Sequence, residues 1–103
     1  MLWEKTRYRV NLRGGKAEFK TTPMHGLIQQ MIIEPANETT VWSAQILDSE
    51  GDRIFGVKDH IGRLDNFDGL PVGRDTPEQL KVLIYDTTSN EPFCVMFKVR
   101  EGK

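Results

Sequence analysis

The sequence predicts an all-β fold, an antiparallel β-sandwich of jelly-roll or immunoglobulin-like type. Apolar and polar residues alternate in roughly six to eight short runs spaced about ten residues apart, and no segment has a convincing helical period. The 103 residues fit a single domain, 1–103, with one two-layer core. A small β-barrel is the alternative, because period-two alternation does not distinguish a barrel from a sandwich.

The clearest alternation lies in residues 79–99. Two runs of apolar residues at every second position are separated by a polar turn that contains Pro92. We therefore expect two strands that close the domain as a pair. Apolar residues also occur on the opposite faces, which favours a central position for both strands. The alternating apolar residues are Leu80, Val82, Ile84, Phe93, Val95, Phe97 and Val99.

The N-terminal part predicts a half-buried strand over residues 5–13. Gly14-Gly15 follows it and matches the two-residue turns that need positive φ angles, so residues 16–22 are expected to return as the second strand of a hairpin. A single strand interrupted by a Gly-Gly bulge is the alternative.

Three further strands are expected over residues 27–34, 40–48 and 53–58, the last two joined by a hairpin loop at 48–52. Trp42 is expected in the centre of the core. Residues 59–76 contain Pro and Gly breaks and predict a long loop with at most one short strand or helical turn. Thr76-Pro77 resembles a helix start, although only one turn fits before the next strand.

Composition excludes several classes of function. The net charge is −1, which gives no overall attraction to nucleic acid or to an anionic membrane. One cysteine leaves no internal disulfide and no zinc pattern built from paired thiolates. The first residues contain no apolar segment of the kind found in signal peptides, and no run is long enough to span a bilayer. We expect a protein made in the cytoplasm, with no membrane partner.

The residues suited to catalysis or metal binding do not form a recognisable set. Cys94 lies inside a predicted strand and is expected to be a small buried hydrophobic residue. His25 and His60 lie in predicted loops without a third ligand at a suitable spacing. Four acidic residues match a calcium loop in part, but Arg53 occupies the position of the required glycine. We expect no catalytic, cofactor or metal site. The acidic residues are Asp48, Glu50, Asp52 and Asp59.

Basic residues on the outer face of the first predicted strand form the main candidate contact surface. Three interpretations are open: a charged edge that prevents unwanted strand pairing, a contact for an acidic protein, or a contact for nucleic acid. Nucleic acid is disfavoured because no aromatic residue is expected on the basic face itself, since Tyr8 alternates onto the other side of the strand. The basic residues are Lys5, Arg7, Arg9 and Arg13, with Lys16 and Lys20 on the expected hairpin partner.

The apolar pair Leu2 and Trp3 precedes this strand. It is expected either to pack on the domain's own core or, as a contact arm formed by residues 1–4, to insert into a partner.

Four features give the chain a characteristic order of strands and turns: Tyr8-Arg9-Val10-Asn11-Leu12 with Gly14-Gly15, residues 21–26 leading into 27–35, the hairpin at 46–51, and the expected pairing of 80–82 with 93–95. This order resembles that of small structural proteins of tailed bacteriophages. The resemblance implies a non-enzymatic virion protein: a capsid decoration or cement protein, a head-completion protein or a tail adaptor. Its partners would be other copies of itself and the major capsid protein or other virion proteins. The chain departs from the type in being short and in lacking a clear strand over 59–74.

Two other functions are considered. A carbohydrate- or peptide-binding module would need an exposed aromatic platform, for which Trp3, Trp42, Tyr85 and Phe67 are the candidates. An enzyme would need the two histidines and a carboxylate to converge.

Overall fold

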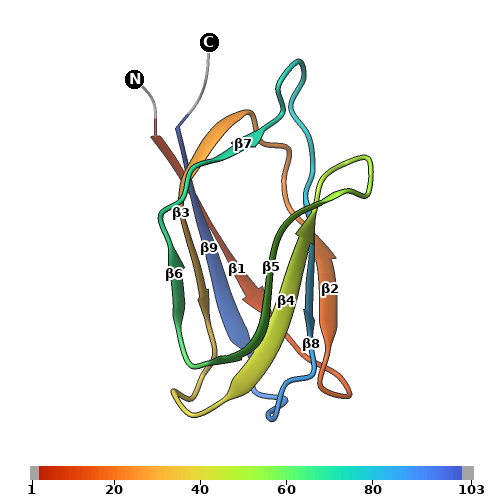
Figure 1. Ribbon diagram of the computed structural model, residues 1–103, viewed down its shortest axis with the longest axis vertical. Coiled ribbons are helices and arrows are strands. Elements are labelled where there is room, and N and C mark those ends of the chain that lie inside the picture. Colours follow the sequence, from red (N-terminus) through yellow and green to blue (C-terminus); the bar gives the residue numbers. More distant parts are fainter. Residues whose placement is uncertain (1–2, 101–103) are drawn as a thin grey trace.

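The structure, a computed structural model, describes residues 3–100 and is an antiparallel β-sandwich, as predicted (Figure 1). Nine strands in this part of the chain form two sheets. The first sheet contains β1 (Trp3–Val10), β9 (Phe93–Arg100), β3 (Gly26–Glu34) and β6 (Leu64–Asn66) in that order, and β7 (Leu70–Val72) also pairs with β3. The second sheet contains β2 (Ala17–Lys20), β8 (Lys81–Tyr85), β4 (Val41–Leu47) and β5 (Arg53–Ile61).

The pairing of the strands is nested, which identifies the jelly-roll type of sandwich. The first strand pairs with the last, β2 pairs with β8, β3 pairs with both β6 and β7, and β4 pairs with β5. Because β6 and β7 both pair with β3, they act as one interrupted strand. The fold is then an eight-stranded double sheet of the jelly-roll kind.

The two C-terminal strands form where the sequence predicts them, but they do not pair with each other. β8 lies between β2 and β4, whereas β9 lies between β1 and β3 in the other sheet. Each strand is central in its sheet, as expected. The segment 86–92 therefore connects the two sheets and does not close a hairpin. Alternation alone predicted the wrong partner because it fixes which face of a strand is buried and not which strand lies beside it.

The Gly14-Gly15 turn forms as predicted, but the strands on either side of it separate at once. Both glycines have positive φ angles, 62° and 74°, and Arg13 and Lys16 exchange backbone hydrogen bonds of 2.9 and 3.3 Å. Beyond this bridge, β1 continues in the first sheet and β2 in the second. The expected two-stranded ribbon is therefore absent from the described residues.

The segment predicted as a long loop contains the end of one strand and two short strands. β5 extends to Ile61, past the predicted end at residue 58, and β6 and β7 have three residues each. Asp59 has a φ angle of 52°, and the register with β4 shifts between Trp42 and Ala44. This bulge breaks the alternation of β5, and three residues are too few to show a period.

The core lies between the sheets, and Trp42 is fully buried in it, as predicted. Its indole Nε1 donates a 2.7 Å hydrogen bond to the carbonyl oxygen of Gly62. The ring meets Phe93 nearly at right angles, with 5.6 Å between centroids, and lies 5.2 Å from the ring of His60. Trp42 thus joins the two sheets and fixes the connection between β5 and β6.

Residues 3–100 contain no helix that is long and apolar enough to cross a membrane.

Candidate functional site

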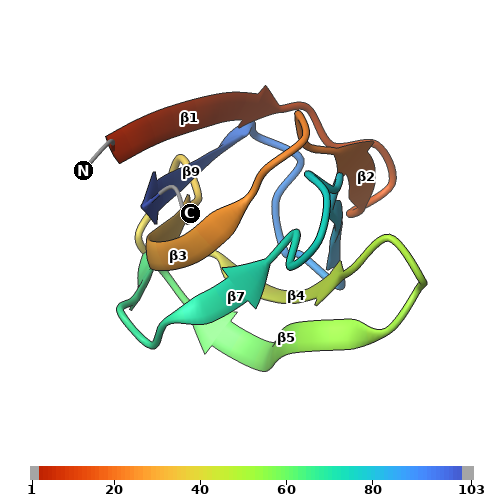
Figure 2. The ribbon, with the colours of Figure 1, turned by 90° about the horizontal axis from the view of Figure 1, so that it is seen from above.

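β1 is an edge strand with one side open. It pairs with β9 along all eight residues, and no other strand of the described chain pairs with it. Figure 2 shows β1 at the margin of the molecule. In an antiparallel pair, every second residue directs its N–H and C=O groups away from the partner strand. Among the described residues, no backbone hydrogen bond to another segment engages this outer edge.

The side chains of β1 alternate between exposed cations and residues that face the core. Lys5, Arg7 and Arg9 are exposed, whereas Tyr8 is half-buried and Val10 is buried. None of the three cations forms an ion pair with a side chain that the structure describes. At about 3.4 Å per residue, successive cations lie about 7 Å apart along the strand. The open edge is therefore bordered by a row of unpaired positive charge, which we call the β1 cation row.

The cation row is narrow, because the neighbouring strand is largely uncharged opposite its centre. Arg7 lies opposite Met96, which is 7% exposed, and Arg9 lies opposite Cys94. The basic residues of β9 are Lys98, which lies opposite Lys5, and Arg100, which lies opposite Trp3, and neither belongs to the row.

At the opposite edge of the same sheet, around β3 and β6, the charged side chains form ion pairs with one another. Arg63 lies 3.0 Å from a carboxylate oxygen of Asp65 and 3.7 Å from one of Glu34. Gln30 also donates a hydrogen bond of 3.3 Å to Asp65. Among the described side chains, Arg63 is thus paired with carboxylates, unlike Lys5, Arg7 and Arg9 at the β1 edge.

The six predicted cations do not share one face, which corrects the sequence interpretation. Arg13 and Lys16 flank the turn, and Lys20 lies in the second sheet, opposite Lys81. Only Lys5, Arg7 and Arg9 form a row. Of the predicted apolar pair, Leu2 lies outside the described residues. The backbone of Trp3 pairs with Arg100, but its side chain lies outside the described part of the structure.

Cys94 is exposed, and its prediction as a buried residue is wrong. Phe93 and Val95 face the core, so strand alternation places Cys94 on the outer surface, between Arg9 and Glu34.

Two other groups considered as candidate site residues, His60 and Asp48, form hydrogen bonds within the fold. His60 lies in β5, and its Nε2 is 2.9 Å from the carbonyl oxygen of Arg63. Asp48 accepts hydrogen bonds of 2.9 Å from the backbone N–H groups of Glu50 and Asp52, so it closes the hairpin loop. Within residues 3–100, no three His, Cys, Asp or Glu side chains are grouped as metal ligands would be.

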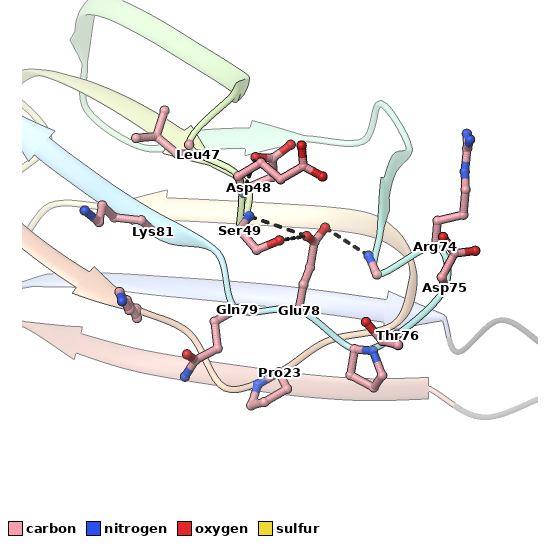
Figure 3. A pocket seen from close by; sticks show the side chains of 15 residues that line it. Pro23, Leu47, Asp48, Ser49, Arg74, Asp75, Thr76, Glu78, Gln79 and Lys81 are labelled. Atoms are coloured by element: carbon pink, nitrogen blue, oxygen red, sulfur yellow. Dashed lines mark hydrogen bonds between the residues drawn. The ribbon is translucent and has the colours of Figure 1, made fainter.

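Glu78, which the sequence analysis did not single out, connects three loops beside a hollow at one end of the sandwich (Figure 3). Its Oε2 accepts hydrogen bonds from the hydroxyl group and the N–H of Ser49, at 2.6 and 3.4 Å, and its Oε1 accepts one of 3.0 Å from Gly73 N–H. Its own N–H and C=O pair with Met24. Residues 76–79, which resemble a helix start, are not helical.

These hydrogen bonds give a testable pH dependence. The hydrogen bond from the Ser49 hydroxyl, followed by that from Gly73 N–H, lowers the pKa of the Glu78 carboxyl below its ordinary value. The resulting stabilisation is fully present above the pKa of the unfolded state and is lost as the pH falls through the folded-state pKa. We expect Glu78→Gln to destabilise the protein at pH 7 by about 1 kcal/mol, and to destabilise it less in acid.

Urea unfolding of both proteins at a series of pH values below 7 measures this difference. The exposed neighbour Glu50 supplies the control, Glu50→Gln, which should have little effect at any pH. A Glu78→Gln effect that is the same at neutral and acid pH would contradict the assigned role of the carboxylate.

Of the aromatic residues proposed as a stacking platform, Trp42 is buried and Tyr85 is half-buried, with its hydroxyl accepting a 3.3 Å hydrogen bond from Gln45. Phe67 is 68% exposed. The described residues therefore provide one largely exposed ring from this set, on the turn between β6 and β7.

Comparison with protein-family models, with curated proteins and with solved structures found no match for this chain.

Proposed function

We propose that this protein is a non-enzymatic structural component of a tailed-phage virion, a capsid decoration protein or a head–tail component, that binds a neighbouring virion protein through β1. The observation that carries the proposal is the open edge of β1 with its unpaired cation row. An edge strand that presents unpaired backbone groups is a ready site for protein contact. The resemblance in the order of strands and turns supplies the virion context, without the pairing of 80–82 with 93–95, which does not form.

The jelly-roll architecture is compatible with this proposal. Viral capsid domains share it, and so do lectin domains and cupins, so the fold by itself does not select among them. The charge distribution says more than the fold about the kind of partner. The chain as a whole has a net charge of −1, yet β1 is locally positive. Such a local field steers an acidic protein surface toward β1.

The proposal is tested on particles prepared from the strain that carries the gene. We expect mass spectrometry of gradient-purified particles to detect the chain at a fixed number of copies per particle. Arg7→Glu is expected to reduce its incorporation about tenfold or more, because it places a negative charge in the contact. Lys58→Glu makes the same charge change at an exposed position of β5, in the other sheet, and should be incorporated normally.

Absence of the chain from particles, with the protein recovered free in the lysate, would contradict the virion proposal. Equal incorporation of the two variants would show that β1 is not the contact. Thermal unfolding of both variants establishes that neither has lost its fold.

A carbohydrate- or peptide-binding module is the second candidate, and exposure of Phe67 is the observation that favours it. Glycan binding by the full chain that is abolished in Phe67→Ala would support this function over the first.

A further inference from the structure

The outer edge of β1 has the geometry that accepts another strand. Its alternate N–H and C=O groups point away from β9, and no described segment forms backbone hydrogen bonds with them. An extended peptide satisfies such groups by adding to the sheet, and its main-chain hydrogen bonds then contribute affinity.

The charge on β1 argues against a second copy of the same strand as the occupant. Antiparallel pairing about Arg7 would place Arg7 opposite its own copy and Lys5 opposite Arg9. Parallel pairing in register would place each cation opposite the same cation. Like charges directly opposite each other on a sheet are destabilising. A shift of one residue would instead put the core-facing residues, such as Val10, on the face of the partner's cations.

An added acidic strand would form hydrogen bonds with the open backbone groups of β1 and opposite-charge pairs with its cations. Carboxylates at every second residue would lie opposite Lys5, Arg7 and Arg9 on the outer face. The intervening residues would lie on the inner face, beside Thr6 and Tyr8, which are half-buried rather than buried. A nucleic acid would supply negative charge at a similar spacing, but it has no amide groups with which to extend the sheet.

We propose that β1 accepts an extended acidic segment of a partner protein, with Asp or Glu at every second residue, by main-chain strand addition. This inference rests on the proposed function, because it names the chemistry of the partner at the same strand.

The test uses the full chain and a synthetic peptide, Thr-Glu-Val-Glu-Val-Glu-Thr with blocked ends, in calorimetric titrations. Three opposite-charge pairs should form only when the glutamates alternate, so an isomer with the glutamates in succession should bind about tenfold more weakly or worse. Arg7→Glu should weaken binding of the alternating peptide about tenfold, and Lys58→Glu should leave it unchanged.

Two N-methylated peptides separate strand addition from charge attraction. One carries N-methyl groups on its glutamates and the other on its valines. In an added strand only one of these sets points toward β1, so one peptide should lose binding and the other should retain it.

Several results would overturn the inference. Absence of peptide binding would do so, as would equal binding of the two isomers or of the two N-methylated peptides. Tighter binding of a single-stranded oligothymidine than of the alternating peptide would indicate a nucleic-acid contact.

Particles that contain the chain, together with no peptide binding, would leave the proposed function standing while the inference fails. Peptide binding with particles that lack the chain would remove the virion role and leave β1 as a strand acceptor.

Discussion

Replacing Gly73 by alanine is expected to destabilise the protein by about 3 kcal/mol, because two costs coincide at this residue. Gly73 has a φ angle of +62°, which side chains disfavour. A Cβ atom there would lie 2.8 Å from the carbonyl oxygen of Thr76 and closer still to that of Met24. Both are backbone atoms, so neither moves without shifting the loops that Glu78 connects.

Gly14 provides a matched control, since its φ angle is also +62° but an added Cβ would meet nothing within 4 Å. Gly14→Ala is expected to cost about 1 kcal/mol, from the backbone conformation alone. Urea unfolding of both variants separates the steric cost from the conformational cost. Equal losses of stability in the two variants would contradict the close packing described around Gly73.

The second large effect is expected at Trp42. Trp42→Ala removes a fully buried side chain and should cost about 4 kcal/mol, a large fraction of the ~5–15 kcal/mol by which a domain of this size is stable. Trp42→Phe is the more informative variant. It retains a ring but leaves the carbonyl oxygen of Gly62 without its 2.7 Å hydrogen bond, at a cost of about 2 kcal/mol.

Phe67→Ala is the control for Trp42→Phe, because it removes an aromatic side chain that is 68% exposed and should change stability by less than about 0.5 kcal/mol. Thermal or urea unfolding measures all three variants. If Trp42→Phe is as mild as Phe67→Ala, then the hydrogen bond from Trp42 to Gly62 does not fix the connection between β5 and β6 as described.

The sequence predicted which residues face the core, because that information is local to each strand. Alternation around Val82, Ile84 and Val95 identified the inner faces, and each of these side chains is at most 1% exposed. The same alternation placed Lys5, Arg7 and Arg9 on an outer face. Alternation also indicates an outward-facing Cys94, because its neighbours Phe93 and Val95 both face the core, and the prediction of a buried Cys94 did not use this signal.

Strand partners were not predictable in the same way, because they depend on contacts between residues far apart in the chain. Gly14-Gly15 correctly predicted a tight turn, yet the next residues enter different sheets. Residues 86–92 have the composition of a hairpin loop and instead cross between the sheets. The backbone geometry of a turn does not fix where the flanking strands find their partners.

The sequence predicted only part of the candidate site, because strand partners again decide the rest. Exposure of the β1 cations followed from alternation, but the separation of Lys20 from them followed from the sheet to which β2 belongs. The role of Glu78 depends on loops contributed by Met24, Ser49 and Gly73, which only the folded chain brings together.

The central claim is that β1 has an open edge that binds an acidic strand, and amide hydrogen exchange followed by NMR tests it most directly. In the free protein, alternate amides of β1 should exchange rapidly, whereas the intervening amides, bonded to β9, should exchange slowly. Addition of the alternating acidic peptide should slow the rapid set and leave the other set unchanged. Slow exchange at every β1 amide in the free protein, or a rapid set that the peptide does not protect, would contradict the account.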